Sequence, residues 1–368
     1  MASLIFKWLK SENTSSPESR ELATKTREAF GMSSRDYRRA LSDGRKYIDI
    51  VERKMSSNNW QAIDYERVPS KANLIYKNAF MKHDPERRQD YLDGLTSGEA
   101  KINSSAAFPH DIVHKYNISH YNWECVPEKI EEDTVLEEMW KALPDFVNGN
   151  GNTIVVADGS GSMVTPIGKD TSVTALEVAN ALAIYFAQHQ EGPFKNKYIT
   201  FSHTPKFVNV GHPTLRENLV EASNHCEISN TNIEAVFNMV LKTAVDNKLH
   251  QEEIPNILII SDMQFDDAVC SYASKWGIRD TLFETIAKKY ASHGYEPPKL
   301  IFWNLNNYGR SKNVPVTYNK NGVILVSGYS PAICKMVLSN KTDPYEAMVD
   351  TLNSERYQMV EDAFNKAG

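Results

Sequence analysis

Residues 153–163 combine an apolar run with a turn whose side-chain oxygens are suited to binding a cation. The run Thr-Ile-Val-Val-Ala at 153–157 is typical of a strand buried on both faces of a sheet. Asp158, Ser160 and Ser162 follow it, separated by single glycines that let the backbone fold closely around a small object. A turn this polar costs free energy to bury unless its side chains are bound. The segment therefore predicts a binding turn at the end of a core strand.

Two loops further along the chain supply oxygen atoms in a similar way. The apolar run 257–260 ends in Ser261 and Asp262, and Thr231 lies in a hydroxyl-bearing loop just ahead of a helical pattern. Oxygen donors from three loops indicate a hard cation, because Mg²⁺ prefers six oxygen ligands in near-octahedral array. We expect Mg²⁺ as the cofactor, with Mn²⁺ or Ca²⁺ as alternatives. The expected metal ligands are Asp158, Ser160, Ser162, Thr231 and Asp262.

The expected ligand set contains few carboxylates, which leaves the ion electron-poor and at least one coordination position open. An anion from outside, either a carboxylate of a protein partner or a phosphate, is the natural occupant of that position. Asp266 lies just past Asp262 and is expected to steady a water molecule bound to the ion, although it is also suited to capping the next segment. The alternative for residues 158–162 is a polar strand-to-helix turn with a capping residue and no ion.

The chain from residue 150 onward alternates strand and helix patterns. The expected strands are 153–157, 198–202, 206–210, 256–261, 299–304 and 322–327, and the expected helices are 171–189, 213–222, 232–247, 280–292, 330–339 and 343–365. This alternation predicts a doubly wound, mainly parallel α/β sheet, with 198–202 and 206–210 forming an antiparallel hairpin at one edge. Right-handed crossovers place the strands at 153 and 256 side by side, so Asp158 and Asp262 should meet in one crevice.

Residues 20–146 show almost only helical patterns, after a lead-in at 1–19 that is expected to be flexible because residues 11–19 are polar. Breaks at Pro69 and Pro85 divide the pattern into short helices, which predicts helical hairpins packed side by side in a repeat-like domain. Residues 1–101 carry 19 Lys and Arg against 15 Asp and Glu, whereas the whole chain has a net charge of −6. The helical part is therefore the part suited to a polyanion. The candidates for phosphate contacts are Lys71, Lys77, Lys82, Arg87 and Arg88. A solvated polar helix face is the alternative explanation for them.

Neither a zinc knuckle nor a disulfide framework is predicted. The four cysteines are scattered with no short spacing, which is typical of free thiols in a reducing compartment. His110 and His114 have the four-residue spacing that can hold zinc on a helix, but no third ligand is evident, so a structural or solvent role is expected. The first ten residues are too short and too interrupted for a signal peptide, and no stretch has the roughly 20 apolar residues of a membrane span. Cytoplasmic or nuclear residence is therefore expected, with no membrane partner.

The spacing Asp158-x-Ser160-x-Ser162, together with Thr231 and Asp262, resembles the metal-ion-dependent adhesion site of von Willebrand factor type A domains, which have a Rossmann-like fold. More specific phrases resemble an uncharacterised intracellular family that carries such a domain; these are 68–73, 79–84, 261–266, 302–305 and 326–330. The two N-terminal phrases are also distantly similar to the TROVE module of the Ro autoantigen, in which helical repeats joined to a type A domain bind small RNAs. The resemblance implies an α-helical TROVE-like domain at 20–146 and a type A domain with its ion site at 150–368. Only the distant similarity to Ro implies RNA.

The leading hypothesis is a non-enzymatic, metal-dependent binding protein of the ribonucleoprotein type, with small or single-stranded RNA as its partner. An alternative is an adaptor whose bound ion captures an Asp or Glu of an acidic protein partner. A phosphoryl-transfer enzyme with Asp158 as nucleophile comes third, because Ser160 replaces the second acid of the common phosphatase pattern. The phosphate-loop, dinucleotide-binding and nucleophile-elbow motifs are incomplete. The sequence leaves the oligomeric state open.

Overall fold

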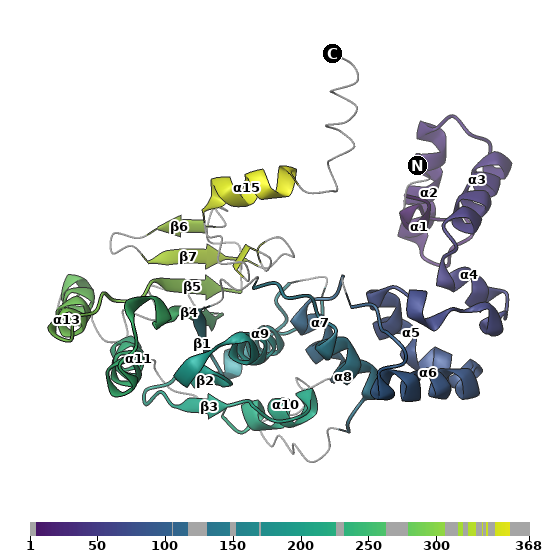
Figure 1. The fold of residues 1–368 in the computed structure, drawn as a ribbon. Helices are drawn as coiled ribbons and strands as arrows, with labels where there is room; N and C mark the ends of the chain where they lie inside the picture. Colours follow the sequence, from purple (N-terminus) through teal and green to yellow (C-terminus); the bar gives the residue numbers. More distant parts are fainter. Residues whose placement is uncertain are drawn as a thin grey trace. The chain divides into compact units, whose positions relative to one another are not determined.

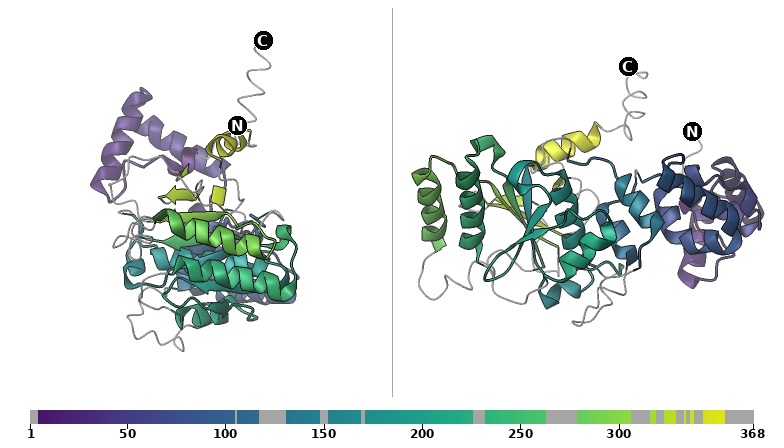
Figure 2. Two further views of the ribbon diagram at one scale, coloured as in Figure 1. Left: turned by 90° about the vertical axis from the view of Figure 1, so that its left-hand side faces the viewer. Right: turned by 60° about the horizontal axis from the view of Figure 1, so that its bottom comes forward.

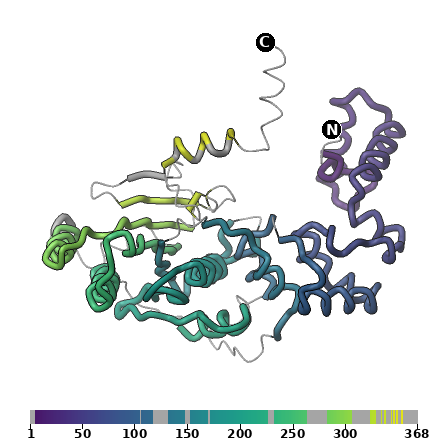
Figure 3. Tube along the Cα trace, in the orientation of Figure 1, coloured from purple at the N-terminus to yellow at the C-terminus, as the bar shows by residue number. Residues whose placement is uncertain are grey.

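The chain folds into two compact units, Met1–Ala106 and Ala107–Gly368, each with its own apolar clusters. A computed structural model describes residues 5–104, 106–116, 131–147, 152–168, 171–225, 232–262, 279–305, 316–318, 323–328, 333, 336–337 and 343–353 (Figure 3). Within these residues the first unit is helical and the second contains the sheet. A helical N-terminal part followed by an α/β part is therefore confirmed.

Short helices build the first unit (Figure 1). They are α1 (Ile5–Trp8), α2 (Pro17–Ala29), α3 (Ser34–Tyr47), α4 (Val51–Ser56), η1 (Trp60–Ala62), η2 (Tyr65–Arg67), α5 (Ser70–His83) and α6 (Pro85–Ser97). Serine hydroxyls start the two longer early helices, because Ser16 and Ser33 accept hydrogen bonds from backbone N–H groups that the helix leaves unpaired. Gly98 ends α6 with a φ of +81°, a left-handed conformation that glycine adopts without steric cost.

The first unit buries its apolar side chains in two small clusters. One joins α2 and α3 through Ala23, Tyr37 and Leu41, with α1 packed against it. Residues 5–19, expected to be a flexible lead-in, instead contain α1 and the start of α2, because the apolar side chains of this segment pack on the cluster. The other is formed by side chains from α4 through α6, among them Phe80 of α5 and Tyr91 of α6. Each cluster is small, so the polar and aromatic contacts described below matter for the stability of this unit.

A sheet with helices on both faces forms the second unit (Figure 1). Its strands are β1 (Thr153–Ala157), β2 (Lys197–Thr200), β3 (Phe207–Asn209), β4 (Asn256–Ser261), β5 (Leu300–Asn304), β6 (Val316–Tyr318) and β7 (Ile324–Ser327). Its helices are α7 (Pro109–Val113), η3 (His114–Tyr116), α8 (Thr134–Lys141), η6 (Gly161–Val164), α9 (Ala175–His189), η7 (Gly192–Phe194), α10 (Leu215–Ser223), α11 (Ile233–Asn247), η8 (Gln251–Glu253), α13 (Arg279–Ser292) and α15 (Pro344–Leu352).

The described strands run in the order β3-β2-β1-β4-β5-β7-β6. The inner pairs are parallel, whereas β2–β3 and β6–β7 are antiparallel and lie at the two edges. The predicted hairpin at one edge and the predicted parallel pairing of β1 with β4 are confirmed, with Val156 opposite Ile259. The sequence did not predict β6, because three residues are too few to show strand periodicity.

Alternation along the strands distributes the apolar side chains between two layers. Ile154 and Val156 of β1 pack in one cluster with α11 and α13. Figure 2 shows these two helices on one side of the sheet and α9 on the other, where α9 contacts β1 and β2. Helix α9 begins at Ala175, later than expected, because Thr174 caps it and exchanges hydrogen bonds with Glu177.

The division between the units lies 40 residues earlier than the boundary expected near residue 146. Helix α7 packs on α9, and α8 packs on α10. Glu137 of α8 accepts hydrogen bonds from the backbone N–H groups of Leu215 and Arg216 at 2.7 and 2.9 Å, at the start of α10. The helices after Ala106 therefore belong with the sheet. A helical pattern alone does not reveal which core a helix covers.

Candidate functional site

The carboxyl ends of β1 and β4 lie side by side, because these strands are neighbouring and parallel. Asp158 directly follows β1, and its backbone N–H donates to the carbonyl oxygen of Ile260 at 3.1 Å. Asp262 directly follows Ser261, the last residue of β4. The chain leaves β1 toward β2 on one side and returns to β4 on the other, so the two aspartates lie at the switch point of the sheet.

Asp158 is buried, with 3% of its surface exposed. One carboxylate oxygen, Oδ1, accepts a hydrogen bond from the backbone N–H of Ser160 at 2.8 Å. The other, Oδ2, accepts one from the hydroxyl of Ser261 at 2.6 Å. Burial raises the pKa of Asp158, although these hydrogen bonds act in the opposite direction. The fold therefore keeps a carboxylate where a negative charge is costly without a nearby cation.

Hydrogen bonds through Ser160 and Ser162 link Asp158 to Asp262, beginning with the bond from the backbone N–H of Ser160 to Asp158. The hydroxyl of Ser162 donates to Oδ1 of Asp262 at 2.9 Å, and the hydroxyl oxygens of Ser160 and Ser162 are 3.2 Å apart. Since Ser162 uses its only hydroxyl proton toward Asp262, Ser160 is the donor in the pair of serines. The structure thus brings together four of the residues predicted from the sequence. Thr231 and Asp266 lie outside the described residues.

The spacing of these oxygen atoms suits the coordination sphere of a small divalent ion. Neighbouring ligand oxygens around octahedral Mg²⁺ are about 3.0 Å apart, given metal–oxygen distances of about 2.1 Å. The contacts from Ser162 to Ser160 and to Asp262, at 3.2 and 2.9 Å, fall near this value. Among the described residues no cluster of three or more His, Cys, Asp or Glu gathers to hold a metal. A site here depends on serine hydroxyls as well as carboxylates.

Ser261 belongs to this cluster and was not predicted as part of it. Its side chain is fully buried and its hydroxyl makes the shortest contact to Asp158. The available signal was its position, since a serine ending an otherwise apolar strand next to Asp262 is a polar group in a core environment.

Arg88 is buried inside the first unit, so its prediction as an RNA contact is wrong for this conformation. Only 1% of the residue is exposed, and its guanidinium lies 4.9 to 5.3 Å from the ring centres of Tyr65, Phe80 and Tyr91. Both terminal nitrogens contact Oδ1 of Asn73 at 3.4 Å. The cation therefore interacts with aromatic faces and an amide oxygen within the helical core.

Arg87 also makes internal contacts. It donates to Asp84 at 2.8 Å and to the backbone carbonyl oxygens of Trp60 and Ile63 at 3.2 and 2.8 Å. Asp84 additionally accepts a hydrogen bond from the hydroxyl of Tyr65. These bonds tie α6 to the segment before α5, so this side chain is occupied within the fold.

The three predicted lysines lie on α5. Lys71 and Lys82 are exposed, and Lys77 is half-buried. Because the two arginines of α6 make internal contacts, the basic surface of the first unit is narrower than the sequence suggested. Of the predicted residues, it consists of the lysines of α5.

His114 connects η3 to the segment that precedes α9. One ring nitrogen, Nδ1, lies 2.9 Å from Oε2 of Glu177, and the other, Nε2, lies 3.1 Å from the hydroxyl of Ser172. Because a carboxylate only accepts, a neutral His114 carries its proton on Nδ1 and accepts from Ser172. His110 is instead buried and stacked on Phe108. The two histidines therefore serve different contacts, in agreement with the structural role expected for them.

The protein thus belongs to the class of two-unit proteins in which a helical unit precedes a mainly parallel α/β unit. Its candidate site is the cluster of oxygen-bearing side chains at the switch point of the sheet. The chain belongs to the family described as Domain of unknown function (DUF7788), whose model matches residues 152–367. A second model, Domain of unknown function (DUF2828), matches residues 1–152. The change of family at residue 152 lies close to the start of β1.

Two known proteins are similar to this chain. Uncharacterized protein L728 of Acanthamoeba polyphaga mimivirus is 30% identical over 355 residues, covering 92% of this chain and 58% of that protein. The chain thus spans less than two thirds of the length of this relative. The crystal structure of the Deinococcus radiodurans RO (RSR) protein aligns over 92% of this chain and 73% of that chain, with 15% identity and a TM-score of 0.36. A TM-score this low does not establish a shared fold.

In the part of the chain that the structure describes, no helix is both long enough and apolar enough to cross a membrane.

Proposed function

We propose that this protein is a non-enzymatic binding protein that uses a divalent cation, Mg²⁺ in the first place, to hold an acidic group of its ligand. The supporting observation is the linked set of oxygen-bearing side chains at the adjacent ends of β1 and β4. Their spacing, and the buried charge of Asp158 beside them, fit a small hard cation. The resemblance to the von Willebrand type A ion site supports the same assignment.

Each residue has a distinct part in this proposal. Ser160, Ser162 and Asp262 hold the ion with Thr231, and Asp158 supplies negative charge from the buried end of β1. The bound ion supplies a positive charge that attracts a phosphate or carboxylate. In this proposal Asp158 is a supporting charge and not a nucleophile, a role favoured by its burial and by the hydrogen bonds to both of its oxygens. The proposal therefore contains no phosphoryl-transfer step.

Single-stranded RNA is the ligand that we favour. The excess of Lys and Arg in residues 1–101 and the exposed lysines of α5 support a polyanion. The distant resemblance of the N-terminal phrases to the Ro autoantigen also supports RNA as the ligand. A phosphate of the RNA would then be the acidic group held by the ion.

Thermal unfolding of the full-length protein, with and without MgCl₂, tests the ion site. Wild type and the control variant Asp246→Asn, an exposed α11 carboxylate paired with Lys242, should gain stability from MgCl₂. Asp262→Asn should gain none. An identical response of Asp262→Asn and wild type would overturn the ion site.

Fluorescence anisotropy of a labelled single-stranded RNA, first in MgCl₂ and then in EDTA, tests the ligand. We expect salt-dependent binding that weakens on chelation. Binding that is unchanged in EDTA would separate the ion from RNA, and absence of binding in both conditions would exclude RNA as the ligand.

A protein carboxylate is the second candidate for the ligand. The observation in its favour is that Arg87 and Arg88 are used inside the first unit, which reduces the basic surface available to RNA. An adaptor of this kind would bind its protein partner in MgCl₂ without nucleic acid and release it in EDTA.

A further inference from the structure

We infer that the first unit carries a binding site for a nucleotide, in a basic cavity formed by α1, α3 and α4. The cavity has a volume of about 620 Å³, within the range of about 300–1,000 Å³ typical of small-molecule sites. Five cationic side chains line it together with an indole; these residues are Lys7, Lys10, Arg38, Arg45, Arg53 and Trp8. The one carboxylate among the lining residues is Glu52.

Hydrogen bonds orient two of the three arginines without neutralising them. Arg45 donates to the backbone carbonyl oxygens of Phe6 and Leu9 at 3.1 and 2.7 Å. Arg38 donates to the carbonyl oxygen of Ser34 at 3.1 Å. These acceptors carry no net charge, so both guanidinium groups keep theirs. A cavity with this excess of positive charge attracts phosphate groups.

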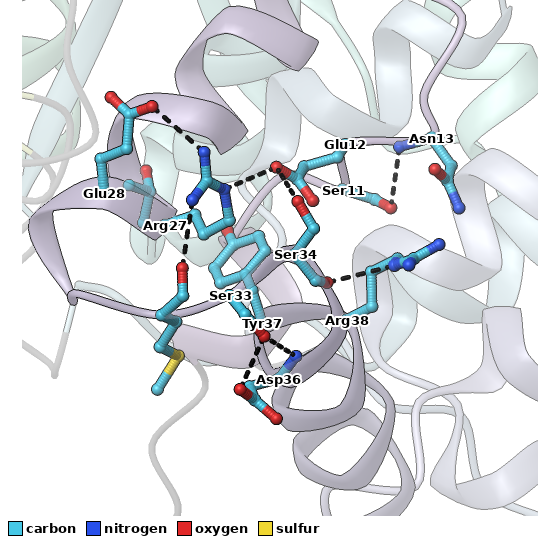
Figure 4. A network of polar contacts seen from close by, with 12 residues as sticks. Ser11, Glu12, Asn13, Arg27, Glu28, Ser33, Ser34, Asp36, Tyr37 and Arg38 are labelled. Atoms are coloured by element: carbon cyan, nitrogen blue, oxygen red, sulfur yellow. Dashed lines mark hydrogen bonds and ion pairs between the residues drawn. The ribbon is translucent and has the colours of Figure 1, made fainter.

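Glu12 lies between two lining residues in the sequence, but its carboxylate is kept away from the cavity. Figure 4 shows Glu12 bonded to Arg27 and Ser34, at 2.9 and 3.3 Å. Arg27 also donates to Glu28 and to the carbonyl oxygen of Met32. Glu12 is absent from the cavity lining, although its neighbours Ser11 and Asn13 belong to it. The network therefore holds this segment in place while it directs the negative charge elsewhere.

A buried tyrosine of α3 holds the segment after α1, which lines the cavity. Tyr37 of α3 is 1% exposed, and its hydroxyl donates to the carbonyl oxygen of Lys10 at 2.9 Å. Leu41, one turn further along the same helix, is buried and also lines the cavity. The backbone that carries the cationic side chains is thus attached to the small core of α2 and α3.

Trp8 distinguishes a nucleotide from a simple anion. Its side chain lines the cavity, yet 70% of the residue is exposed. An exposed indole beside phosphate-binding cations is suited to stacking on a base, as aromatic side chains do in proteins that bind single-stranded nucleic acids. A phosphate next to an aromatic base is the chemistry of a nucleotide unit, either free or within single-stranded RNA.

The inference rests on the proposed function for RNA as one source of that unit, but it does not depend on the cation. Binding in this cavity should persist in EDTA and in Asp262→Asn. If MgCl₂ does not stabilise wild type but RNA still binds in EDTA, the ion site alone is refuted. If MgCl₂ stabilises wild type but RNA does not bind in EDTA, the cavity alone is refuted.

The experiment measures the anisotropy of fluorescein-labelled decauridylate, titrated with full-length protein in EDTA at low salt. Arg38→Glu and Arg39→Glu form a matched pair, because both lie on α3 and Arg39 is 81% exposed but does not line the cavity. We expect Arg38→Glu to weaken binding at least tenfold and Arg39→Glu to change it less than threefold. Equal effects of the two substitutions would overturn the site.

A second pair tests the stacking contact. Trp8→Ala should weaken binding of the same probe about fivefold or more, whereas Tyr47→Ala, which removes another exposed aromatic of the unit, should leave it unchanged. Competition separates the two sources of the ligand: displacement by ATP identifies a free nucleotide, and displacement by unlabelled decauridylate alone identifies RNA. Displacement by tripolyphosphate as efficient as by ATP, with Trp8→Ala equal to wild type, would show a simple anion site and overturn the inference.

Discussion

At the scale of the residue, the end of β1 carries a buried carboxylate. Asp158 is held by a backbone N–H and by the hydroxyl of Ser261, and burial still raises its pKa. A raised pKa means that the folded protein favours the protonated acid. The charged form therefore lowers stability at pH values above the folded-state pKa, and this penalty fades as the pH falls through that pKa.

Replacing this carboxylate should stabilise the cation-free protein. We expect Asp158→Asn to unfold at a higher temperature than wild type at neutral pH in EDTA, and the difference to shrink as the pH falls. With free Mg²⁺ at about 100 times its dissociation constant, wild type should gain about 2.7 kcal/mol, and the variant should gain almost nothing. Thermal unfolding as a function of pH and MgCl₂ measures both effects. A variant that is less stable than wild type in EDTA at neutral pH would contradict the burial argument.

Arg88 is a residue whose position, rather than its charge, decides its role. Because its side chain fills the space among Tyr65, Phe80 and Tyr91, Arg88→Ala should lower the free energy of unfolding by about 3 kcal/mol. The exposed control Lys82→Ala should change it by less than about 0.5 kcal/mol. Urea denaturation followed by circular dichroism gives both values. Unchanged stability combined with weaker RNA binding would return Arg88 to the list of RNA contacts.

At the scale of the element, α8 is attached to the sheet through a buried carboxylate. Glu137 accepts from two backbone N–H groups of α10 and from the hydroxyl of Tyr116 at 2.5 Å. Burial and the nearby Glu137 raise the pKa of Tyr116, so its hydroxyl stays protonated and remains a donor. The arrangement places a negative charge at the positive end of a helix.

Removing that charge should loosen the contact between α8 and α10. Glu137→Gln is expected to cost about 1–3 kcal/mol, because an amide group accepts fewer hydrogen bonds and brings a buried donor that needs a new partner. The neighbouring Glu138→Gln alters only an ion pair with the largely exposed Lys141 and should cost at most about 1 kcal/mol. Chemical denaturation of both variants provides the comparison. Equal losses would show that α8 is held by apolar packing alone.

At the scale of the whole molecule, the two units have separate cores, so we expect the chain after residue 106 to fold independently of the chain before it. A fragment of residues 107–368 retains α7 and α8 on the sheet, whereas a fragment that begins at 150 exposes the apolar surfaces of α9 and α10. We expect the longer fragment to unfold cooperatively and to keep the Mg²⁺ response. The shorter fragment should be markedly less stable or aggregate. Thermal melts of the two fragments test this, and equal stability would place the boundary near residue 150.

The sequence by itself determined that the strands at 153 and 256 are neighbours, that the sheet is mainly parallel with a hairpin at one edge, and that Asp158 meets Asp262. Those features depend on local periodicity and on the handedness of crossovers, which act alike wherever such patterns occur. The same patterns indicated the helical character of the first part of the chain. A strand of three residues, β6, is too short to give such a signal.

Only the tertiary structure decided which charged side chains face inward. Arg87 and Arg88 follow each other in a polar stretch that resembles a solvated helix face. Arg88 is nevertheless buried against aromatic partners contributed by η2 and α5, whereas Arg87 stays partly exposed and donates to Asp84 and to backbone carbonyl oxygens. The attachment of α8 to the sheet depends on Glu137 meeting Leu215, 78 positions along the chain. The basic cavity likewise collects side chains from three helices. Contacts between distant segments leave no periodic trace in the sequence, so their consequences for charge and burial appear only when the chain is folded.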